Sequence, residues 1–255
     1  MLSKYIPALA ALMSSALAAT PAGFEPGSET SVLVVFGNVA ALDGVVVAKS
    51  TTQTPPTLAT QSKLDGSSFA ILMIDLDIPT DNPPQTNTLL HWMQTGLTQS
   101  SSAVPLNTTT DSFTAFVLSV PQDEAAFAPY LGPSPPARIP LSHTYTEIIV
   151  DTSDASEEAL STLQAAAANR QGFNAQSVLT SAGLADKVVA GNFFNVTNPG
   201  PVSDSTASNS TTGRGNGTSS GSPPSQSPII AAAVSQRAST SLLAIMLAGV
   251  AFFTL

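Results

Sequence analysis

The stretch "SSFAILMIDLDIP", residues 67–79, decides the fold. It is rich in β-branched and apolar residues, follows an Asp-Gly pair and ends at a proline, a pattern typical of a buried strand. Side chains two positions apart on a strand share a face. The intervening leucine and isoleucine side chains should therefore face a core, while Asp75 and Asp77 share the other face at the end of the strand.

Other stretches of the chain carry the same kind of pattern and are separated by loops rich in proline and serine. We expect strands at 31–38, 44–50, 112–121, 142–151 and 186–196. Strands joined by short loops favour an antiparallel arrangement over alternating strand–helix units. The sequence therefore predicts an α+β fold that is mainly β, an antiparallel β-sandwich with a few peripheral helices.

Two helices are expected before the last strand. Asp154 is in position to cap the first helix, with Glu157 three residues later as in a capping box. Leucine and alanine then recur at helical spacing. Asn174 is in position to cap a shorter helix, which Gly183 should end.

Both ends of the chain have the composition of processing signals. Residues 1–19 contain Lys4, an apolar stretch and a small-residue cleavage pattern, which indicates a secretory signal peptide cut after Ala18 or Ala19. A buried N-terminal helix is the alternative interpretation. The apolar tail at 242–255 is shorter than the roughly 20 residues of a spanning helix.

A short apolar tail behind a spacer is typical of a glycosylphosphatidylinositol (GPI) attachment signal. We expect this signal at 229–255, behind a Ser/Thr/Gly/Pro-rich disordered stalk at 199–228, and keep a short tail anchor as the alternative. The candidate attachment residues are Ser220, Gly221, Ser222, Ala231 and Ala232. The protein should enter the secretory pathway and reach the extracellular face of the plasma membrane or the cell wall through a lipid anchor.

The remaining segment, 20–198, has the length of one domain. The whole chain carries a net charge of −9 at pH 7, which argues against nucleic-acid binding. The absence of cysteine excludes disulfides, thiol catalysis and cysteine metal sites. Potential N-glycosylation sequons, which fit a surface glycoprotein, occur at Asn107, Asn195, Asn209 and Asn216.

Rare residues lie close to the expected strand ends. The chain has two histidines, and His91 stands in "LLHWM" (89–93) beside Trp92, the one tryptophan. The second, His143, should share a strand face with Tyr145. Each feature alone is more often structural, as a turn aspartate or a satisfied core histidine, but together they indicate a candidate site.

Four motifs in order resemble the phosphatidylethanolamine-binding protein family. They are "FAILMIDLDIP", "LLHWM", "YLGPSPP" followed by "SHTY", and "GFNAQSVLTSAGLADKVVAGNFFNV", and they span about residues 30–197. The resemblance implies a sheet-rich fold with a small anion pocket at one end. It also implies partners such as phospholipid head groups, small phosphorylated anions or a protease.

The resemblance also implies which residues form the pocket. Matched motif by motif, the ligand-binding residues would be Asp75, Asp77, His91, His143 and Tyr145, and the rim would comprise Pro79, Trp92, Pro133, Pro135 and Pro136. Imidazole N–H groups and a tyrosine hydroxyl donate well to phosphate oxygens, and a neighbouring carboxylate favours the charged imidazole. No cofactor and no metal are implied.

The sequence departs from the family pattern at three points. Leu76 stands where the family usually has proline, Thr144 stands where it usually has arginine, and a long Ser/Thr-rich loop is expected between Leu97 and Thr114. Replacing arginine by Thr144 removes a charge and an expected ion pair. Arg138 is the one cationic residue expected near the motifs, so anion affinity should be modest.

Three hypotheses on function follow. The favoured one is a non-enzymatic cell-surface protein with an anion pocket for phospholipid head groups or phosphorylated ligands. The alternative is a protein-interaction module such as a serine carboxypeptidase inhibitor, because one fold supports many functions. A metal-dependent or hydrolytic enzyme is less favoured, since the Asp and His spacing matches no dense metal motif and no G-x-S-x-G sequence accompanies Ser142.

Overall fold

A computed structural model describes residues 19–120 and 122–200. Within this part the strands, in chain order, are β1 (Leu33–Phe36), β2 (Val39–Ala40), β3 (Thr57–Thr60), β4 (Phe69–Pro79), β5 (Thr86–Gln99), β6 (Val104–Asn107), β7 (Ser112–Ser119), β8 (Ser142–Asp151) and β9 (Val188–Thr197). The helices are α1 (Glu157–Ala167) and α2 (Ala175–Ser181), with short 3-10 turns η1 (Lys49–Thr52) and η2 (Ala185–Lys187).

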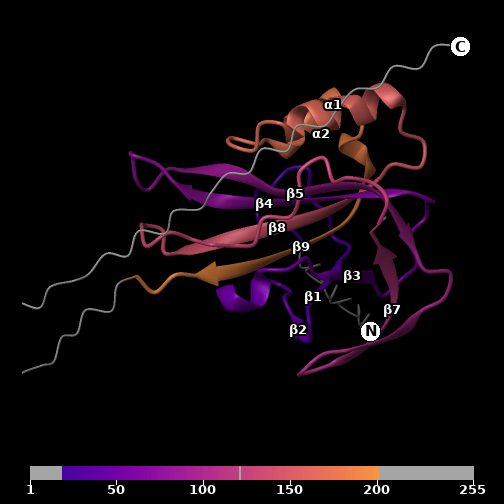
Figure 1. Cartoon of the computed structure of the whole chain (residues 1–255), viewed down its shortest axis with the longest axis horizontal. Helices are drawn as coiled ribbons and strands as arrows, with labels where there is room; N and C mark the ends of the chain where they lie inside the picture. Colours follow the sequence, from indigo (N-terminus) through magenta and orange to yellow (C-terminus); the bar gives the residue numbers. More distant parts are fainter. Residues whose placement is uncertain (1–18, 121, 201–255) are drawn as a thin grey trace, which may run out of the picture. The chain divides into compact units, whose positions relative to one another are not determined.

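The strands of the described residues join into one curled antiparallel sheet. Its order is β2-β1-β3-β7-β5-β4-β8-β9, and β6 adds to β7. The curl occurs on β5, which pairs with β4 along most of its length and with β7 through Thr98 and Gln99 at its end. The sheet thereby folds into two facing layers, and the expected mainly β antiparallel fold with peripheral helices is confirmed (Figure 1).

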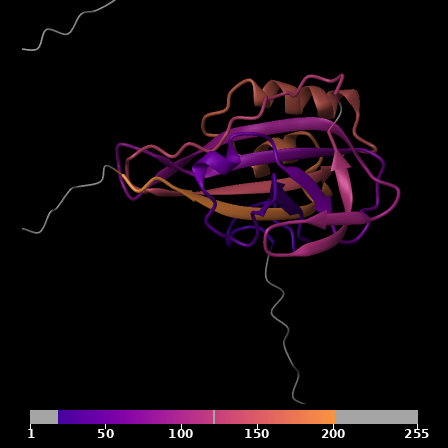
Figure 2. The same ribbon diagram turned by 60° about the horizontal axis from the view of Figure 1, so that its bottom comes forward.

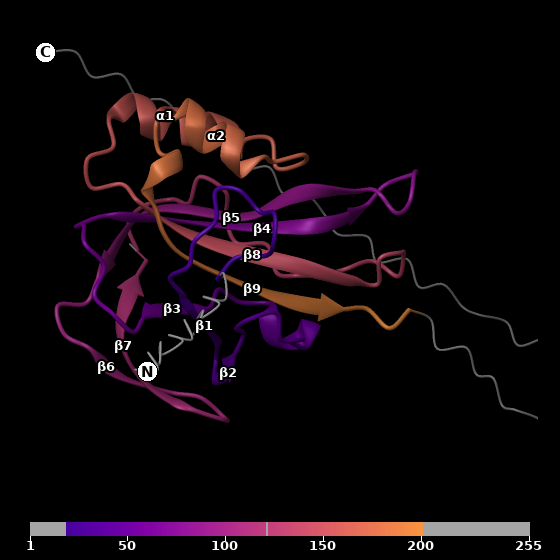
Figure 3. The ribbon, with the colours of Figure 1, turned by 180° about the vertical axis from the view of Figure 1, so that it is seen from behind.

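The helices cover one side of the central strands. In Figure 1 and from behind in Figure 3, α1 and α2 lie against β4 and β5, while β1, β3 and β7 lie on the opposite side of the β4–β5–β8–β9 layer. The turned view in Figure 2 keeps the helices on that same side. The central layer is therefore covered on both faces.

Two large apolar cores cover the two faces of the central layer. Alternate β4 residues such as Leu72 and Ile74 pack toward the helices, with Leu163 and Leu179. The other face of β4 packs between the two sheet layers, where Phe69 belongs to the second core. The continuous apolar run of β4 is explained by burial on both faces, a pattern typical of an inner strand.

The helix ends confirm one expected cap and correct the other. Ser156, not Asp154, caps α1, because its hydroxyl accepts a hydrogen bond from the Ala159 N–H at 3.1 Å. Asn174 caps α2 as expected, accepting from the Ser177 N–H at 2.8 Å. Gly183 follows α2 with φ of 68°, a left-handed conformation that glycine adopts without strain.

Two expectations on strands were wrong. Residues 44–50 form no regular strand; they make an isolated bridge between Val46 and Asn195 of β9 and then enter η1. The expected loop after Leu97 contains β6, which pairs with β7 as a hairpin. The strands β2, β3 and β5 were not predicted.

Several sequence-based expectations lie outside the described residues. These are the signal peptide apart from Ala19, the stalk apart from Pro199 and Gly200, the GPI attachment signal with all its candidate residues, and the sequons at Asn209 and Asn216. Ala19 is buried, and its N–H donates to the Ser28 carbonyl at 2.9 Å. In residues 19–120 and 122–200, no helix is long and apolar enough to cross a membrane.

Candidate functional site

The end of β4 brings the rare side chains together. Asp75 lies between two neighbours in the sheet, pairing with Leu89 of β5 and Tyr145 of β8. His143 lies two residues before Tyr145 on β8, so the two side chains share a face. This part of the prediction needs only strand periodicity and the antiparallel pairing of β4 with β8.

His91 reaches the same face through an irregularity in β5. Met73 pairs with Trp92, whereas the next β4 residue, Ile74, pairs with Leu90, so His91 is an extra residue in the ladder. An extra residue of this kind forms a β-bulge, which turns a side chain away from the regular alternation. The bulge brings His91 to the cavity that Asp75 also lines.

The cavity has a volume of about 120 Å³ and lies at the β4–β8 end of the interlayer core. Pockets for drug-sized ligands measure roughly 300–1,000 Å³, so this one fits a single small group. Its walls combine the polar residues above with apolar and loop residues, namely Asp75, Ile78, Leu89, His91, Leu131, Gly132, Ser134, Pro136, His143 and Tyr145.

Asp75 makes the central polar contacts around this cavity. Its Oδ2 lies 2.8 Å from His143 Nδ1 and 3.8 Å from His91 Nε2. Its Oδ1 accepts a hydrogen bond from the Asp77 N–H at 2.8 Å. Because an ionised carboxylate only accepts, the short contact assigns a proton to Nδ1 of His143.

A loop between β7 and β8 fixes the other imidazole. His91 Nδ1 lies 2.7 Å from the carbonyl oxygen of Leu131, and the Leu131 N–H donates back to the His91 carbonyl at 2.8 Å. A carbonyl oxygen can only accept, so Nδ1 of His91 carries the proton. Both histidines therefore turn their Nε2 atoms away from these fixed contacts.

Three buried polar atoms around the cavity have no hydrogen-bond partner among the described residues. They are Nε2 of His91, Nε2 of His143 and the hydroxyl of Tyr145. Leaving such a group buried and unpaired costs about 1–3 kcal/mol. Since buried polar groups are nearly always paired, three unpaired atoms at one small cavity make it the candidate site.

The charges of the site follow from burial. Burial lowers the pKa of His91, although the Leu131 carbonyl and the charge of Asp75 act in the opposite direction. Burial raises the pKa of Tyr145. The charge and the closeness of the Asp75 carboxylate act in the same direction and the Ser134 backbone acts against them, so the hydroxyl remains a donor. The expectation that a neighbouring carboxylate favours the charged imidazole does not hold for His91, because the loss of hydration on burial outweighs the attraction of Asp75.

Sequence reasoning missed Arg170, which braces the site from the α1–α2 connection. Its guanidinium donates to the carbonyls of Leu90 at 3.2 Å, His91 at 3.1 Å and Pro129 at 2.7 Å. It thereby ties the bulge in β5 to the loop that contacts His91. The expected cation, Arg138, is instead exposed and lies 3.6 Å from Asp81.

The loop between β7 and β8, which forms one wall of the cavity, is also held by contacts with the segment around η1. The Tyr130 hydroxyl donates to the Thr52 carbonyl at 2.8 Å, and Gln53 Nε2 donates to the Pro133 carbonyl at 2.9 Å. A Cβ on Gly132 would lie 2.9 Å from Gln53 Oε1 and 3.0 Å from Gln53 Cα, so the absence of a side chain at this position lets the loop approach η1 closely. The η1 segment, whose first two residues belong to the expected strand at 44–50, thus supports the pocket wall.

Some predicted site residues are not at the cavity. Asp77 turns to β8, where its Oδ2 accepts from the Thr144 N–H at 2.7 Å, and it makes no ion pair with any described residue. Trp92 packs edge-on against Tyr130 in the interlayer core instead of forming the rim. Of the expected rim prolines, Pro136 lines the cavity, whereas Pro79, Pro133 and Pro135 do not.

The described sequons differ in access. Asn107 is exposed at the end of β6. Asn195 is half-buried in β9, and its Nδ2 donates to the Gly44 carbonyl at 2.7 Å. The folded structure therefore favours a glycan at Asn107 and disfavours one at Asn195.

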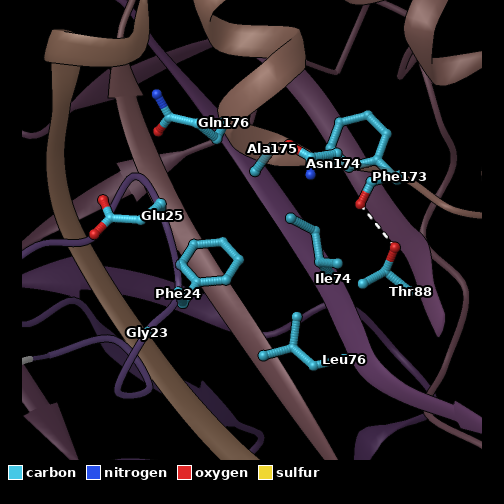
Figure 4. Close-up of a pocket in the computed structure, with 10 residues that line it drawn as sticks. All are labelled: Gly23, Phe24, Glu25, Ile74, Leu76, Thr88, Phe173, Asn174, Ala175 and Gln176. Carbon is cyan, nitrogen blue, oxygen red and sulfur yellow. Dashed lines mark hydrogen bonds between the residues drawn. The ribbon is translucent and has the colours of Figure 1, made fainter. Parts of the chain in front are cut away.

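A second cavity, of about 230 Å³, lies on the opposite face of β4 (Figure 4). Ile74 and Leu76 form its floor, Phe24 and Phe173 its sides, and the Thr88 hydroxyl bonds the Phe173 carbonyl at 2.8 Å. None of the buried unpaired side-chain atoms of the described residues belongs to its lining. The smaller cavity at Asp75 is therefore the better candidate site.

The site does not fit a dense metal cluster. Across residues 19–120 and 122–200, no group of three or more His, Asp or Glu side chains is arranged to hold a metal ion. The polar groups available at the cavity are a hydroxyl donor, two imidazoles and one carboxylate.

The chain is similar to several known proteins. The chain is 28% identical over 207 residues to the phomoidride biosynthesis cluster protein N of Talaromyces stipitatus, a match that covers 75% of this chain and 96% of the relative. Among solved structures it resembles the carboxypeptidase Y inhibitor in complex with its cognate proteinase, with a TM-score of 0.46, 16% identity, and coverage of 68% of this chain and 85% of the inhibitor. It also resembles the phosphatidylethanolamine-binding protein of Plasmodium vivax, with a TM-score of 0.43, 16% identity, and coverage of 66% and 84%.

The family model for phosphatidylethanolamine-binding proteins matches residues 34–194. This range includes every strand from β2 to β8, most of β1 and β9, and all residues that line the cavity. The chain belongs to the phosphatidylethanolamine-binding protein family.

Proposed function

We propose that this protein is a non-enzymatic binding protein whose Asp75 cavity takes a small anion, such as a phosphorylated group or a phospholipid head group. The observation that carries the proposal is the set of three buried, unpaired polar atoms around one small cavity. A phosphoryl group offers several oxygens to one site and is small enough for the volume.

The side chains have defined roles in this proposal. The Tyr145 hydroxyl donates directly to the anion, because its raised pKa keeps it protonated. The imidazoles of His91 and His143 contact the anion through Nε2, and Asp75 orients His143. The carboxylate also opposes a bound anion, so the affinity should be modest.

Thermal unfolding with a panel of anions tests this function. A ligand that binds only the folded state stabilises it by about 2.7 kcal/mol when present at 100 times its dissociation constant. We expect phosphate or phosphoethanolamine to raise the melting temperature of the wild type and to act much less on Tyr145→Phe. Melting curves that no phosphorylated ligand shifts would refute an anion site, and turnover of a bound phosphomonoester would refute a purely binding role.

We further propose that the protein is displayed at the cell surface through its C-terminal signal. The support is the apolar tail at 242–255 behind the Ser/Thr/Gly/Pro-rich segment, together with the N-terminal pattern of a signal peptide. Treating intact cells with a phospholipase that cleaves GPI anchors should release the protein. Retention after cleavage of a known anchored control would contradict this placement.

A second candidate function is inhibition of a serine carboxypeptidase. Its support is a set of exposed apolar side chains on the connection between β7 and β8, namely Leu131, Ile139 and Leu141, one of which also lines the cavity. Exposed apolar groups of this kind mark interaction surfaces when they gather. Purified protein in large excess should slow such an enzyme, and Ile139→Asp should weaken the effect; unchanged peptidase activity would eliminate this candidate.

A further inference from the structure

The cavity offers acceptors where an anion needs donors. Nδ1–H of His143 is used by Asp75, and Nδ1–H of His91 is used by the Leu131 carbonyl. A neutral imidazole has one N–H only, so each free Nε2 then carries a lone pair. The Tyr145 hydroxyl is the remaining donor among the unpaired atoms.

The surrounding charges make the binding of an anion without a proton still less favourable. Asp75 faces both histidines from β4, and the two histidines face each other from β5 and β8. Arg170 approaches His91 from the α1–α2 connection, but its guanidinium is used by three carbonyls. No other charged side chain among the described residues lines the cavity.

We propose that the cavity binds its anion together with one proton, and that it therefore selects phosphoryl groups that carry a P–OH over phosphodiesters and sulfate. The proton lies between a phosphoryl oxygen and Nε2 of a histidine, either as P–OH donating to the lone pair or as imidazolium donating to the oxygen. Both descriptions contain the same atoms and charge. This inference rests on the proposed anion-binding function and narrows its ligand class.

The chemistry of the ligands explains the expected selectivity. A phosphomonoester has a second pKa near 6, so close to neutral pH it can supply this hydrogen itself. A diester or sulfate has none to supply, and the proton must then come from solvent to an imidazole. Burial of His91 disfavours that charged form.

Calorimetric titration of the full protein with methyl phosphate, dimethyl phosphate and sulfate tests the inference. Repeating the titration at pH 8 in buffers with different heats of ionisation gives the number of protons taken up. For methyl phosphate we expect uptake of about one proton and, by linkage, an affinity that falls about tenfold per pH unit between pH 7 and 8.5. Dimethyl phosphate and sulfate should bind at least tenfold more weakly.

Variants sharpen the test. His91→Gln places an amide that can donate N–H without taking a proton, so its binding should depend less on pH and discriminate less against sulfate. Gln176→Ala, in the cavity on the opposite face of β4, is the matched control and should behave as wild type. If His91→Gln fails to fold, the number of protons taken up by the wild type still tests the inference.

The outcomes separate this inference from the proposed function. Methyl phosphate binding without proton uptake, with sulfate bound equally well, would overturn the inference and leave anion binding intact. Failure of all three anions to bind would overturn both. Tight binding of dimethyl phosphate in preference to methyl phosphate would also overturn the inference, and it would favour a lipid head group as the ligand.

Discussion

Tyr145 is a residue whose contributions to stability and to binding should have opposite signs. Its hydroxyl is buried and unpaired in the ligand-free fold, while its ring stacks on Phe194 at 5.5 Å. Tyr145→Phe keeps the ring and removes the unpaired group. We expect the free energy of unfolding without ligand to stay equal or rise by up to about 1 kcal/mol, and phosphate binding to weaken about tenfold or more.

Chemical denaturation and anion titration of the same variant check this pair of effects. Loss of stability together with unchanged binding would mean that the hydroxyl has a partner within the protein. A substitution of His143 would not separate stability from binding in this way, because it also removes the short hydrogen bond from His143 Nδ1 to the Asp75 carboxylate.

Glu147 is a second residue that sequence patterns did not single out. It is fully buried between the layers, its Oε1 is unpaired among the described atoms, and Asn192 Nδ2 donates to its Oε2 at 3.3 Å. Burial raises the pKa of Glu147 well above its usual value. The folded state therefore holds the proton more tightly than the unfolded state does.

The sign of the resulting pH dependence is fixed by this difference. Because the unfolded carboxyl releases its proton near pH 4.3 and the folded one releases it at higher pH, stability falls as pH rises above the unfolded value. Glu147→Gln should remove this fall and raise the free energy of unfolding at pH 7 more than at pH 4. Denaturation curves at the two pH values measure it, and an equal effect at both would contradict a protonated Glu147.

At the scale of elements, Arg170 should matter through the loop it holds. Arg170→Met removes the donors to three carbonyls, so the bulge at His91 and the loop at Pro129 lose their link. We expect weaker anion binding and faster hydrogen exchange of the Leu131 amide. Arg138→Met removes an exposed guanidinium and is the control; equal effects in the two variants would contradict a positioning role.

The α2 cap provides a contrasting prediction on the other side of the sheet. Asn174→Ala removes the side-chain acceptor for the Ser177 N–H, which should lower stability by about 1 kcal/mol. Because the cap belongs to the helix layer, anion affinity should remain unchanged when measured well below the melting temperature. A large loss of affinity would show that the two faces of β4 are coupled.

The strands show which parts of the fold could be predicted from the sequence. The runs of β4 and β8 are continuous, so both strands and the shared face of His143 and Tyr145 were predictable from periodicity. Their meeting with Asp75 was implied by the family resemblance. The strand β5 was not, because polar residues and Gly96 interrupt its apolar pattern. The bulge at His91 depends on the register with β4, which is a tertiary property and leaves no local signal.

The same limit explains the misplaced site residues. The family resemblance implied a rim of prolines, but tertiary contacts decide which loop residues face the cavity. Pro136 lines the cavity, whereas the Pro133 carbonyl accepts a hydrogen bond from Gln53. The register of β4 with β5 shifts between Asp75 and Ile78, so strand alternation alone no longer predicts the position of the Asp77 side chain. Arg170 could have been noticed as one of few cations, but its carbonyl partners come from distant segments.

At the scale of the whole molecule, the described fold makes a prediction about glycosylation. The Asn107 sequon is exposed, whereas Asn195 donates through Nδ2 to the Gly44 carbonyl within a paired strand. Mass spectrometry of protein secreted by a eukaryotic host should find a glycan at Asn107 and an unmodified Asn195. A fully occupied Asn195 would contradict the contact between its side-chain amide and the Gly44 carbonyl.

The most direct test of the central claim uses the small number of histidines in the whole chain. With two imidazoles in the sequence, their nitrogen and carbon-bound proton signals are assigned with one His→Gln variant. Titration with methyl phosphate, followed by two-dimensional NMR, should shift the signals of His91 and His143 together and to saturation at one common dissociation constant. Signals that remain unmoved at high ligand concentration would contradict an anion site at Asp75.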